Sequence, residues 1–212
     1  MSDNFNIPKL KAKNILGITG GIGCGKTTVT NQLATKGIEI IDADLVARKV
    51  VEPNSKGLNA LVNEFGEHIL QQDKTLDRAK LRQIAFESVN AKDTLNNILH
   101  PLIRIELLNQ LNSAKSQYCV LSAPLLFENN LHTLTKINAL VDIPVDLQIS
   151  RTLERDASSS ENTIKSIIKA QMPRDEKIKL SDIILDNSKD KQHLIGQVDA
   201  LHFKMLNMSS EN

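Results

Sequence analysis

The chain has 212 residues and a formal net charge of +1, with 41% hydrophobic and only 3% aromatic residues. This balance excludes a strongly basic nucleic-acid-binding protein and argues against base stacking on aromatic platforms, so we expect no nucleic-acid partner. Two cysteines are too few for a disulfide scaffold, and no apolar run reaches membrane-spanning length. We therefore expect a reduced, cytoplasmic protein without a membrane partner.

The first elements along the chain predict a βαβ unit. Residues 1–13 are polar, lack the apolar segment of a signal peptide, and predict a flexible N-terminal arm. The apolar run 15–19 predicts a buried parallel strand, and the residues after its glycines predict a helix over 27–35 that Gly37 ends. The run 38–42 predicts a second strand.

The stretch from about residue 45 to residue 111 predicts helices rather than strands. Apolar residues recur there at helical spacing in three segments: 58–65, 81–85 and 95–102. Asp77 and Asp93 are candidate N-caps of the second and third of these helices, and Pro101 is expected to kink or break the third. We interpret this stretch as a helical insertion into an α/β framework.

The α/β framework resumes after this insertion. Further apolar runs predict three more strands, over residues 118–122, 139–143 and 183–185. Residues 146–155 and the residues from about 191 onward predict helices, and Ser158 with Glu161 predicts a capping box that starts another helix between them. Five short strands separated by helices predict a parallel sheet with helices on both faces, in which ligands bind at the carboxyl ends of the strands.

A phosphate-binding loop is the strongest motif in the chain. Residues 20–27 read GGIGCGKT and satisfy the pattern GxxxxGK[ST] in full, between a predicted strand and a predicted helix. The glycines let successive backbone N–H groups face one anion, and the helix offers its positive N-terminal end. Lys26 can reach the β- and γ-phosphates of ATP, and Thr27 can ligate Mg²⁺, so we expect both ATP and Mg²⁺ at this loop.

Cys24 occupies a position of the loop that the pattern leaves open. One interpretation is a small, tolerated side chain. The other interpretation is a reactive thiol, because the helix N-terminus and Lys26 would lower the pKa of Cys24.

Two carboxylates end the second predicted strand, at the edge where the loop also lies. Asp42 and Asp44 are two residues apart, so they point to the same side of an extended segment. An acceptor hydroxyl needs a base or an orienting group, and one of the two aspartates is well placed for that role. Either can also contact Mg²⁺ through water. The alternative is a helix N-cap or a strand end without a catalytic role.

Three arginines and one histidine are candidates for contacts with the substrates. Arg151 and Arg155 are four residues apart and share one helix face, and Arg174 follows beyond a serine-rich loop. Arginine forks neutralise the charge that phosphoryl transfer spreads over oxygens, and a lid carrying them also excludes water. The alternative is a solvated helix face. His100 is either a structural histidine beside Pro101 or part of an acceptor site.

Several segments together resemble the dephospho-CoA kinase family. The start ILGITGGIGCGKTTV is followed by IDADLVARKVVEP, and further matches are LDRAKLRQIAF, LHPLIR, PLLFE, RTLERD and AQMPRDEKIKLSDIILDN. The resemblance covers about residues 15–187. It implies phosphorylation of the ribose 3′-hydroxyl of dephospho-CoA by ATP, which gives CoA and ADP in the last step of coenzyme A biosynthesis.

The resemblance also implies a fold and a domain organisation. The fold is the three-layer P-loop NTPase fold with a five-stranded parallel sheet. The expected parts are a nucleotide-binding core (residues 14–44, 112–150 and 176–212), a helical acceptor domain (45–111) and a small lid (151–175). ATP and dephospho-CoA are the expected partners, and we expect a monomer or a weak homo-oligomer.

The family's functional residues map onto positions of this sequence that match its motifs. The expected catalytic residues are Asp44 as the base, Lys26, Arg151 and Arg155. The expected ATP ligands are Gly21, Ile22, Gly23, Cys24, Gly25, Lys26, Thr27, Thr28 and Arg174. The expected acceptor-site residues are Asp42, Asp44, Arg78, His100 and Arg104, and Thr27 is the expected metal ligand.

Other classes of P-loop protein are the alternatives. The same loop and fold would serve a kinase that acts on a nucleoside or another nucleotide. A regulatory P-loop NTPase is less compatible, because residues 187–190 read NSKD instead of the guanine-reading NKxD, and a DxxG switch segment is missing. A non-catalytic scaffold would not explain why Lys26, Thr27 and Asp44 occur at these positions.

Overall fold

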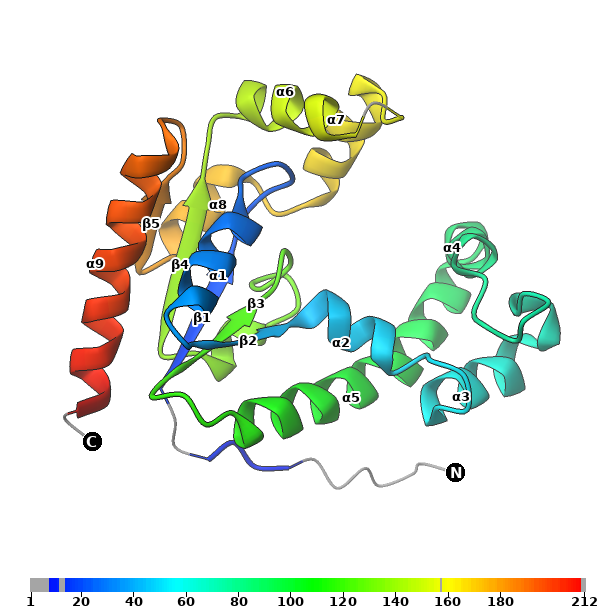
Figure 1. Ribbon diagram of the computed structural model, residues 1–212. Coiled ribbons are helices and arrows are strands. Elements are labelled where there is room, and N and C mark those ends of the chain that lie inside the picture. Colours follow the sequence, from blue (N-terminus) through cyan, green and yellow to red (C-terminus); the bar gives the residue numbers. More distant parts are fainter. Residues whose placement is uncertain (1–7, 12–13, 157, 211–212) are drawn as a thin grey trace. The chain divides into compact units, whose positions relative to one another are not determined.

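The computed structural model describes residues 8–11, 14–156 and 158–210 (Figure 1). The chain forms two compact units, a helical unit built mainly from residues 43–112 and an α/β unit built mainly from residues 14–42 and 113–210. Most of the predicted N-terminal arm, residues 1–13, lies outside the described residues.

The α/β unit contains the predicted five-stranded parallel sheet. Its strands are β1 (Ile15–Thr19), β2 (Glu39–Asp42), β3 (Cys119–Ser122), β4 (Ile137–Asp142) and β5 (Ile183–Asp186). Every neighbouring pair is parallel, and the order in the sheet is β2-β3-β1-β4-β5. All residues of β1 and β3 are buried, which explains their continuous apolar runs. The predicted fold class is therefore confirmed.

The helices predicted for this unit are present, and the structure adds one over residues 174–180 that was not predicted. They are α1 (Lys26–Thr35), α6 (Val145–Arg155), α7 (Glu161–Ala170), α8 (Arg174–Leu180) and α9 (Lys191–Ser210), with a short 3₁₀ turn at Leu131–Leu134. Gly37 ends α1 as predicted, with φ of 78° and its N–H donating to the carbonyl of Ala34.

The predicted cap of α7 is wrong by two residues. Ser160, not Ser158, is the N-cap, and its hydroxyl accepts from the N–H of Thr163 at 3.1 Å. The hydroxyl of Ser158 instead donates to the carboxylate of Asp156 at 2.6 Å. The Asp156 carboxylate also accepts from the backbone N–H of Ser158, so it holds that serine in a turn before the helix begins.

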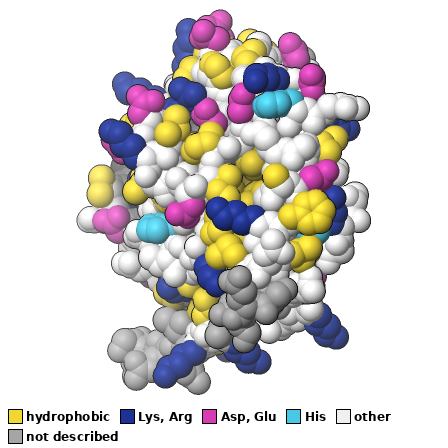
Figure 2. Space-filling model, turned by 90° about the vertical axis from the view of Figure 1, so that its left-hand side faces the viewer, with side chains coloured by type: hydrophobic (Ala, Val, Ile, Leu, Met, Phe, Trp, Pro, Cys, Tyr) yellow, Lys and Arg dark blue, Asp and Glu magenta, His cyan; other side chains and the backbone are white. Residues whose placement is uncertain are grey.

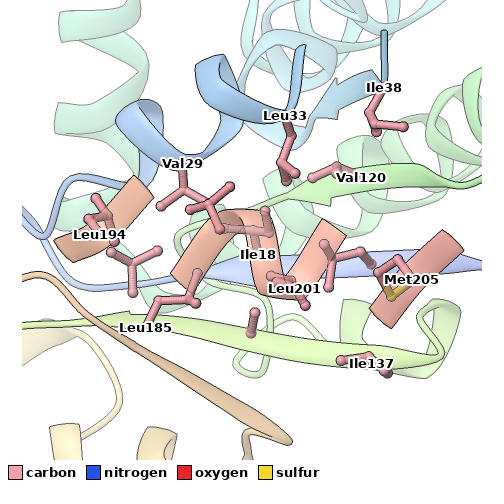
Figure 3. Packing of buried hydrophobic residues seen from close by; sticks show 14 of the residues in the cluster. Ile18, Val29, Leu33, Ile38, Val120, Ile137, Leu185, Leu194, Leu201 and Met205 are labelled. Carbon is pink, nitrogen blue, oxygen red and sulfur yellow. The ribbon is translucent and has the colours of Figure 1, made fainter. Parts of the chain in front are cut away.

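One face of the sheet is covered by α1 and α9. Figure 3 shows Val29 and Leu33 of α1 together with Leu201 and Met205 of α9, packed against strand residues such as Ile18. All five side chains are at most 3% exposed. Burial of this apolar surface stabilises the helices on the sheet and sets where α1 begins relative to β1.

The opposite face is covered by the segment that follows β3 and by α8 (Figure 1). A Cβ at Gly17 of β1 would lie 3.0 Å from Leu126, so glycine permits this close packing. Lys177 of α8 is 3% exposed and pairs with Glu128 at 3.0 Å. Burial opposes ionisation of Glu128, but hydrogen bonds from the Met172 N–H and from Lys177 outweigh it and lower the pKa of this carboxyl.

The helical unit has a core of its own. Its helices are α2 (Ala43–Lys49), α3 (Lys56–Phe65), α4 (Arg78–Glu87) and α5 (Val89–Ser113), with a 3₁₀ turn at Glu67–Ile69. The core residues of this unit are Val51, Leu58, Leu61, Ile69, Leu76 and Leu81. The helical character predicted for this stretch is confirmed.

In the helical unit one predicted cap is confirmed and another is wrong, and of the kink or break expected at Pro101 the break is absent. Asp77 caps α4, accepting from the N–H groups of the second and third helical residues at 3.1 Å. Asp93 is no cap, because α5 already begins at Val89, where the Ser88 hydroxyl accepts from a backbone N–H. The helix also runs unbroken through Pro101. The loss of one hydrogen bond there is outweighed by the rest of a 25-residue helix.

Charged side chains of both signs lie on the face of the molecule that carries α9. Figure 2 shows acidic and basic side chains interspersed with hydrophobic ones on the face that carries α9. Among the described helices, none combines the length and the apolar character that a membrane span requires.

Candidate active site

The carboxyl ends of the five strands gather polar side chains at one edge of the sheet. The last residues of the strands are Thr19, Asp42, Ser122, Asp142 and Asp186. The register places Ser122 beside both Ile18 and Asp42, and Asp142 beside Asp186. The loop that leaves β1 starts at this same edge, which is where parallel α/β sheets bind ligands.

The glycine loop, residues 20–25, is formed as the motif predicts. Gly23 and Gly25 have φ of 71° and 91°, a region in which other residues are strained. A Cβ at Gly23 would lie 2.6 Å from the hydroxyl of Thr152 and 2.7 Å from the carbonyl of Gln148, both on α6. Glycine is therefore required both by the backbone conformation and by the close approach of α6.

Lys26 is held at the sheet edge by the ends of two strands. Its ammonium donates to the Ser122 hydroxyl at 2.9 Å and lies 3.9 Å from the Asp42 carboxylate. The Ser122 hydroxyl in turn donates to Asp42 at 3.1 Å. This chain of contacts fixes a half-buried cation next to the N-terminal end of α1.

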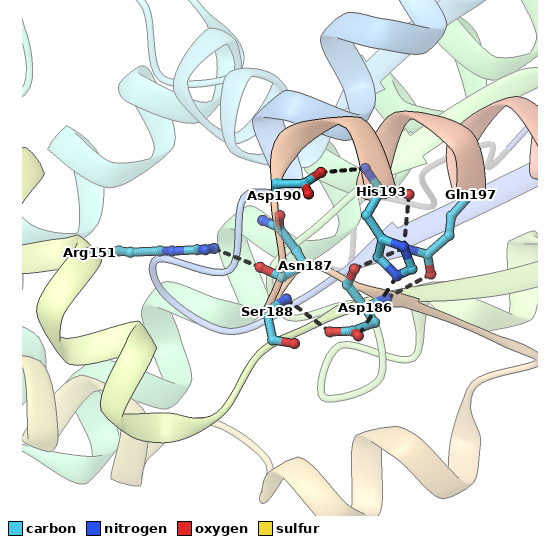
Figure 4. A network of polar contacts seen from close by, with 7 residues as sticks. All are labelled: Arg151, Asp186, Asn187, Ser188, Asp190, His193 and Gln197. Carbon is cyan, nitrogen blue, oxygen red and sulfur yellow. Dashed lines mark hydrogen bonds and ion pairs between the residues drawn. The ribbon is translucent and has the colours of Figure 1, made fainter.

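Arg151 places a second cation beside the loop. Its guanidinium donates to the carbonyl of Asn187 at 2.9 Å (Figure 4). The Asn187 side chain in turn donates to the carbonyl of Cys24 at 2.8 Å. A pocket of about 480 Å³ opens here, with Thr28, Arg151 and Asn187 among its lining residues. Its volume is sufficient for part of a nucleotide.

Arg174 makes a bidentate pair with the end of β4. Its Nε and Nη2 donate to the two carboxylate oxygens of Asp142 at 2.8 and 2.6 Å. This hydrogen bonding raises the pKa of Arg174 further, so it is a permanent cation. The pair also fixes the first residue of α8 to the edge of the sheet.

A protein-family model matches most of this chain, including the residues of the site. The family model for dephospho-CoA kinase matches residues 14–193. The chain belongs to the dephospho-CoA kinase family. The matched range includes the glycine loop, the strand-end aspartates and the arginines described above.

Individual relatives agree with this assignment to the dephospho-CoA kinase family. A dephospho-CoA kinase from Photobacterium profundum is 47% identical over 195 residues, which span 92% of this chain and 97% of the relative. The structure of a dephospho-CoA kinase from Campylobacter jejuni matches with a TM-score of 0.68 and 27% identity, over 92% of this chain and 98% of that one. A structure from Thermus thermophilus matches with a TM-score of 0.79 and 28% identity over the same shares. The family predicted from the motifs is confirmed.

The structure brings some of the predicted site residues together. Lys26 and Asp42 converge at the sheet edge, and Arg151 lies beside the loop. Arg155 is the last residue of α6 and is exposed, while Arg174 is engaged with Asp142. The remaining loop positions lie as predicted, with Gly21, Ile22 and Gly23 half-buried, and Thr27 and Thr28 in the first turn of α1.

The other predicted site residues belong to the helical unit. Asp44 lies in the first turn of α2, so the expectation that Asp42 and Asp44 point to the same side of one extended segment is wrong. Arg78 begins α4 and lines a mostly apolar pocket of about 500 Å³ within this unit. His100 and Arg104 lie one turn apart on α5, so they share one helix face, and His100 is exposed.

The hypothesis of a reactive Cys24 is wrong. The side chain is 2% exposed, and burial raises the pKa of its thiol in spite of the nearby Lys26. Cys24 packs into the core under the loop, so the interpretation as a small, tolerated side chain holds.

Three residues of the site were not singled out from the sequence. They are Ser122, Asp142 and Asn187, and each ends a strand or directly follows one at the carboxyl edge of the sheet. Their position after an apolar run was a usable signal, because this edge is where the loop lies. Their partners are distant in sequence, however, and only the fold identifies them.

Replacing Ser122 by alanine is expected to lower kcat/KM for ATP by about three- to tenfold, because Lys26 and Asp42 both lose a hydrogen-bond partner. Steady-state kinetics of the variant measure this loss. Thr19→Val is the matched control, since it also removes a buried strand-end hydroxyl, here one that donates to the carbonyl of Pro124. Equal losses in both variants would contradict a specific role for Ser122.

Proposed function

We propose that this chain phosphorylates the ribose 3′-hydroxyl of dephospho-CoA with ATP, giving CoA and ADP. The observation that carries the proposal is the glycine loop with Lys26 held by Ser122 and Asp42 at the carboxyl edge of the sheet. Membership of the dephospho-CoA kinase family supports the choice of acceptor.

The loop and the start of α1 are the proposed site of the ATP phosphates. Backbone N–H groups of the loop and the N-terminal end of α1 attract anions. Lys26 is placed to neutralise charge on the β- and γ-phosphates, and Arg151 supplies a second positive charge beside the loop. The pocket next to Thr28 and Asn187 is the proposed place for the rest of the nucleotide.

Mg²⁺ is proposed to arrive with ATP rather than to occupy a ready-made protein site. Within the described part of the chain, no group of three or more His, Cys, Asp or Glu side chains is arranged to hold a metal ion. The Thr27 hydroxyl at the exposed start of α1 and the Asp42 carboxylate fit a hard cation that keeps water and phosphate ligands. When bound, Mg²⁺ neutralises charge on the phosphate oxygens.

Asp44 is the proposed general base. It follows Asp42 by two residues along the chain and lies in the first turn of α2. A carboxylate within hydrogen-bond reach of the acceptor hydroxyl takes its proton as the phosphoryl group is transferred.

The helical unit is the proposed binding region for dephospho-CoA. Arg78 contributes positive charge to the rim of an apolar pocket, and His100 and Arg104 contribute polar groups on α5. An acceptor with an apolar arm and a diphosphate matches such a combination of surfaces. The proposed lid consists of residues 151–175, in which the exposed Arg155 can contact phosphate when the lid closes. Arg174 would first have to leave its bidentate pair with Asp142.

The deciding experiment measures ADP release with ATP and Mg²⁺ in the presence of dephospho-CoA, AMP, CMP, UMP, uridine or no acceptor. We expect ADP formation that depends on dephospho-CoA, with CoA as the product. A preference for a nucleotide or a nucleoside would keep the kinase mechanism and reject the proposed acceptor. Equal ADP release without any acceptor would reject the kinase proposal in favour of an NTPase.

A further inference from the structure

We propose that Asn187 is a positioning residue that holds the glycine loop in its phosphate-binding orientation. Asn187 directly follows β5, in the connection to α9 (Figure 4). It is 9% exposed. It is distant in sequence from the loop, but the fold places its side chain against Cys24 and Gly25.

Asn187 joins three parts of the α/β unit through hydrogen bonds. Its side-chain amide donates to the carbonyl of Cys24 at 2.8 Å in a buried contact. Its backbone N–H donates to the carbonyl of Asp142 at 3.0 Å, and its own carbonyl accepts from Arg151 at 2.9 Å. The backbone bond to the end of β4 anchors Asn187, so its side chain reaches the loop from a rigid base.

The bond to Cys24 determines which way the next N–H group points. The peptide between Cys24 and Gly25 is planar and trans, so its C=O and N–H point in opposite directions. With the carbonyl directed at Asn187, the N–H of Gly25 is directed away from Asn187. A P-loop binds phosphate through such backbone N–H groups, so this orientation is the one that attracts an anion.

Glycine on one side makes this peptide easy to turn over. Gly25 has φ of 91°, and glycine populates positive and negative φ almost equally. A turned peptide would present the carbonyl oxygen of Cys24 where an anion needs a donor. The Asn187 amide disfavours that state, because the turned carbonyl would lose its buried partner.

The contact between the Asn187 side chain and the glycine loop requires a hydrogen-bond donor, and it leaves no room for a side chain at position 25. A Cβ at position 25 would collide with the amide nitrogen of Asn187, so the side chain lies directly on the loop. Aspartate has the same shape but no N–H, and its charge would repel both the Cys24 carbonyl and a bound phosphate. The amide donor of asparagine, and not its size alone, is what this position requires.

The test compares Asn187→Ala and Asn187→Asp with Gln197→Ala. Gln197 exchanges two hydrogen bonds with the backbone of Asp186, at 2.8 and 3.0 Å, so its loss loosens the same connection without touching the glycine loop. Binding of pyrophosphate and of ADP, each with Mg²⁺, is measured by calorimetry, together with kcat, KM for ATP and the midpoint of thermal unfolding. Pyrophosphate reports on the phosphate site alone.

We expect Asn187→Ala to weaken pyrophosphate and ADP binding by about tenfold each, and to raise KM for ATP by a similar factor. Asn187→Asp should weaken the binding of pyrophosphate and of ADP further, because its carboxylate repels phosphate. This variant serves as the test of the Asn187 role if the alanine variant does not fold. Gln197→Ala should stay within about twofold of the unmodified chain in binding, even where its unfolding midpoint falls.

Two results would overturn the inference: unchanged pyrophosphate binding in Asn187→Ala, or an equal loss in Gln197→Ala. If the alanine variant does not fold, unchanged binding in Asn187→Asp overturns it. The inference rests on the proposed use of ATP at the loop, but not on the acceptor. If the unmodified chain binds neither pyrophosphate nor ADP, the proposed function fails. If it binds both and the Asn187 variants do so equally well, only the role of Asn187 fails.

Discussion

The Asp44→Asn variant is expected to lose kcat by about 10²- to 10⁴-fold while its affinity for ATP stays nearly unchanged. Asparagine keeps the size of the side chain but cannot take a proton from the acceptor hydroxyl. The loop, Lys26 and Arg151 belong to the α/β unit and are unaltered in this variant. Steady-state kinetics with dephospho-CoA, combined with calorimetric binding of ADP, measure the two quantities separately.

Asp93→Asn is the matched control for Asp44. Asp93 is also an exposed aspartate near the start of a helix in the helical unit, and no catalytic role is proposed for it. The control should keep kcat within about twofold, as surface substitutions usually do. Turnover close to that of the unmodified chain in Asp44→Asn would eliminate Asp44 as the base, and Asp42 would then be the next residue to substitute.

The Lys26→Met variant is expected to lose kcat by about 10²- to 10³-fold and also to bind ATP more weakly. Methionine retains most of the apolar stem but removes the charge that Ser122 and Asp42 hold at the sheet edge. The loss in kcat should exceed the loss in affinity, since charge on the transferred group and the leaving oxygen is stabilised most in the transition state. Kinetics at saturating ATP and direct ADP binding separate the two effects.

Lys36→Met is the control for this variant. Lys36 caps the other end of α1 and pairs with Asp199 of α9 at 2.9 Å, so its loss tests the general effect of removing a lysine from this helix. We expect a small change in stability and no change in kcat. A Lys26 variant whose kcat matches that of the Lys36 variant would be incompatible with phosphoryl transfer at the loop.

Both predictions use residues that local sequence patterns identify. The glycine loop is a contiguous motif, and its conformation follows from glycines that tolerate positive φ, such as Gly23 and Gly25. Lys26 was assigned from this motif, whereas the local pattern left the base open between Asp42 and Asp44, and the family resemblance chose Asp44. The five strands were also predicted to within about two residues, because continuous apolar runs are typical of strands buried on both faces.

Local capping was predicted with mixed success. Asp77 and Gly37 act as predicted, since each needs only its own neighbours along the chain. Ser158 is no cap because its hydroxyl binds the Asp156 carboxylate instead. Asp93 is no cap because α5 already begins at Val89. Of the kink or break expected at Pro101, the break is absent, since the length of α5 outweighs the cost of one proline.

By itself the sequence determined the family, the class of the fold and the conformation of the glycine loop, because these depend on the order and spacing of neighbouring residues. Only the tertiary structure decided what supports the loop. Ser122 meets Lys26 across 96 positions of the chain, and Asn187 meets Cys24 across 163. Burial also raised the pKa of Cys24, where its neighbours in sequence suggested a lowered one. Hydrogen-bond partners and desolvation depend on which distant strands end side by side, and local periodicity does not contain that information.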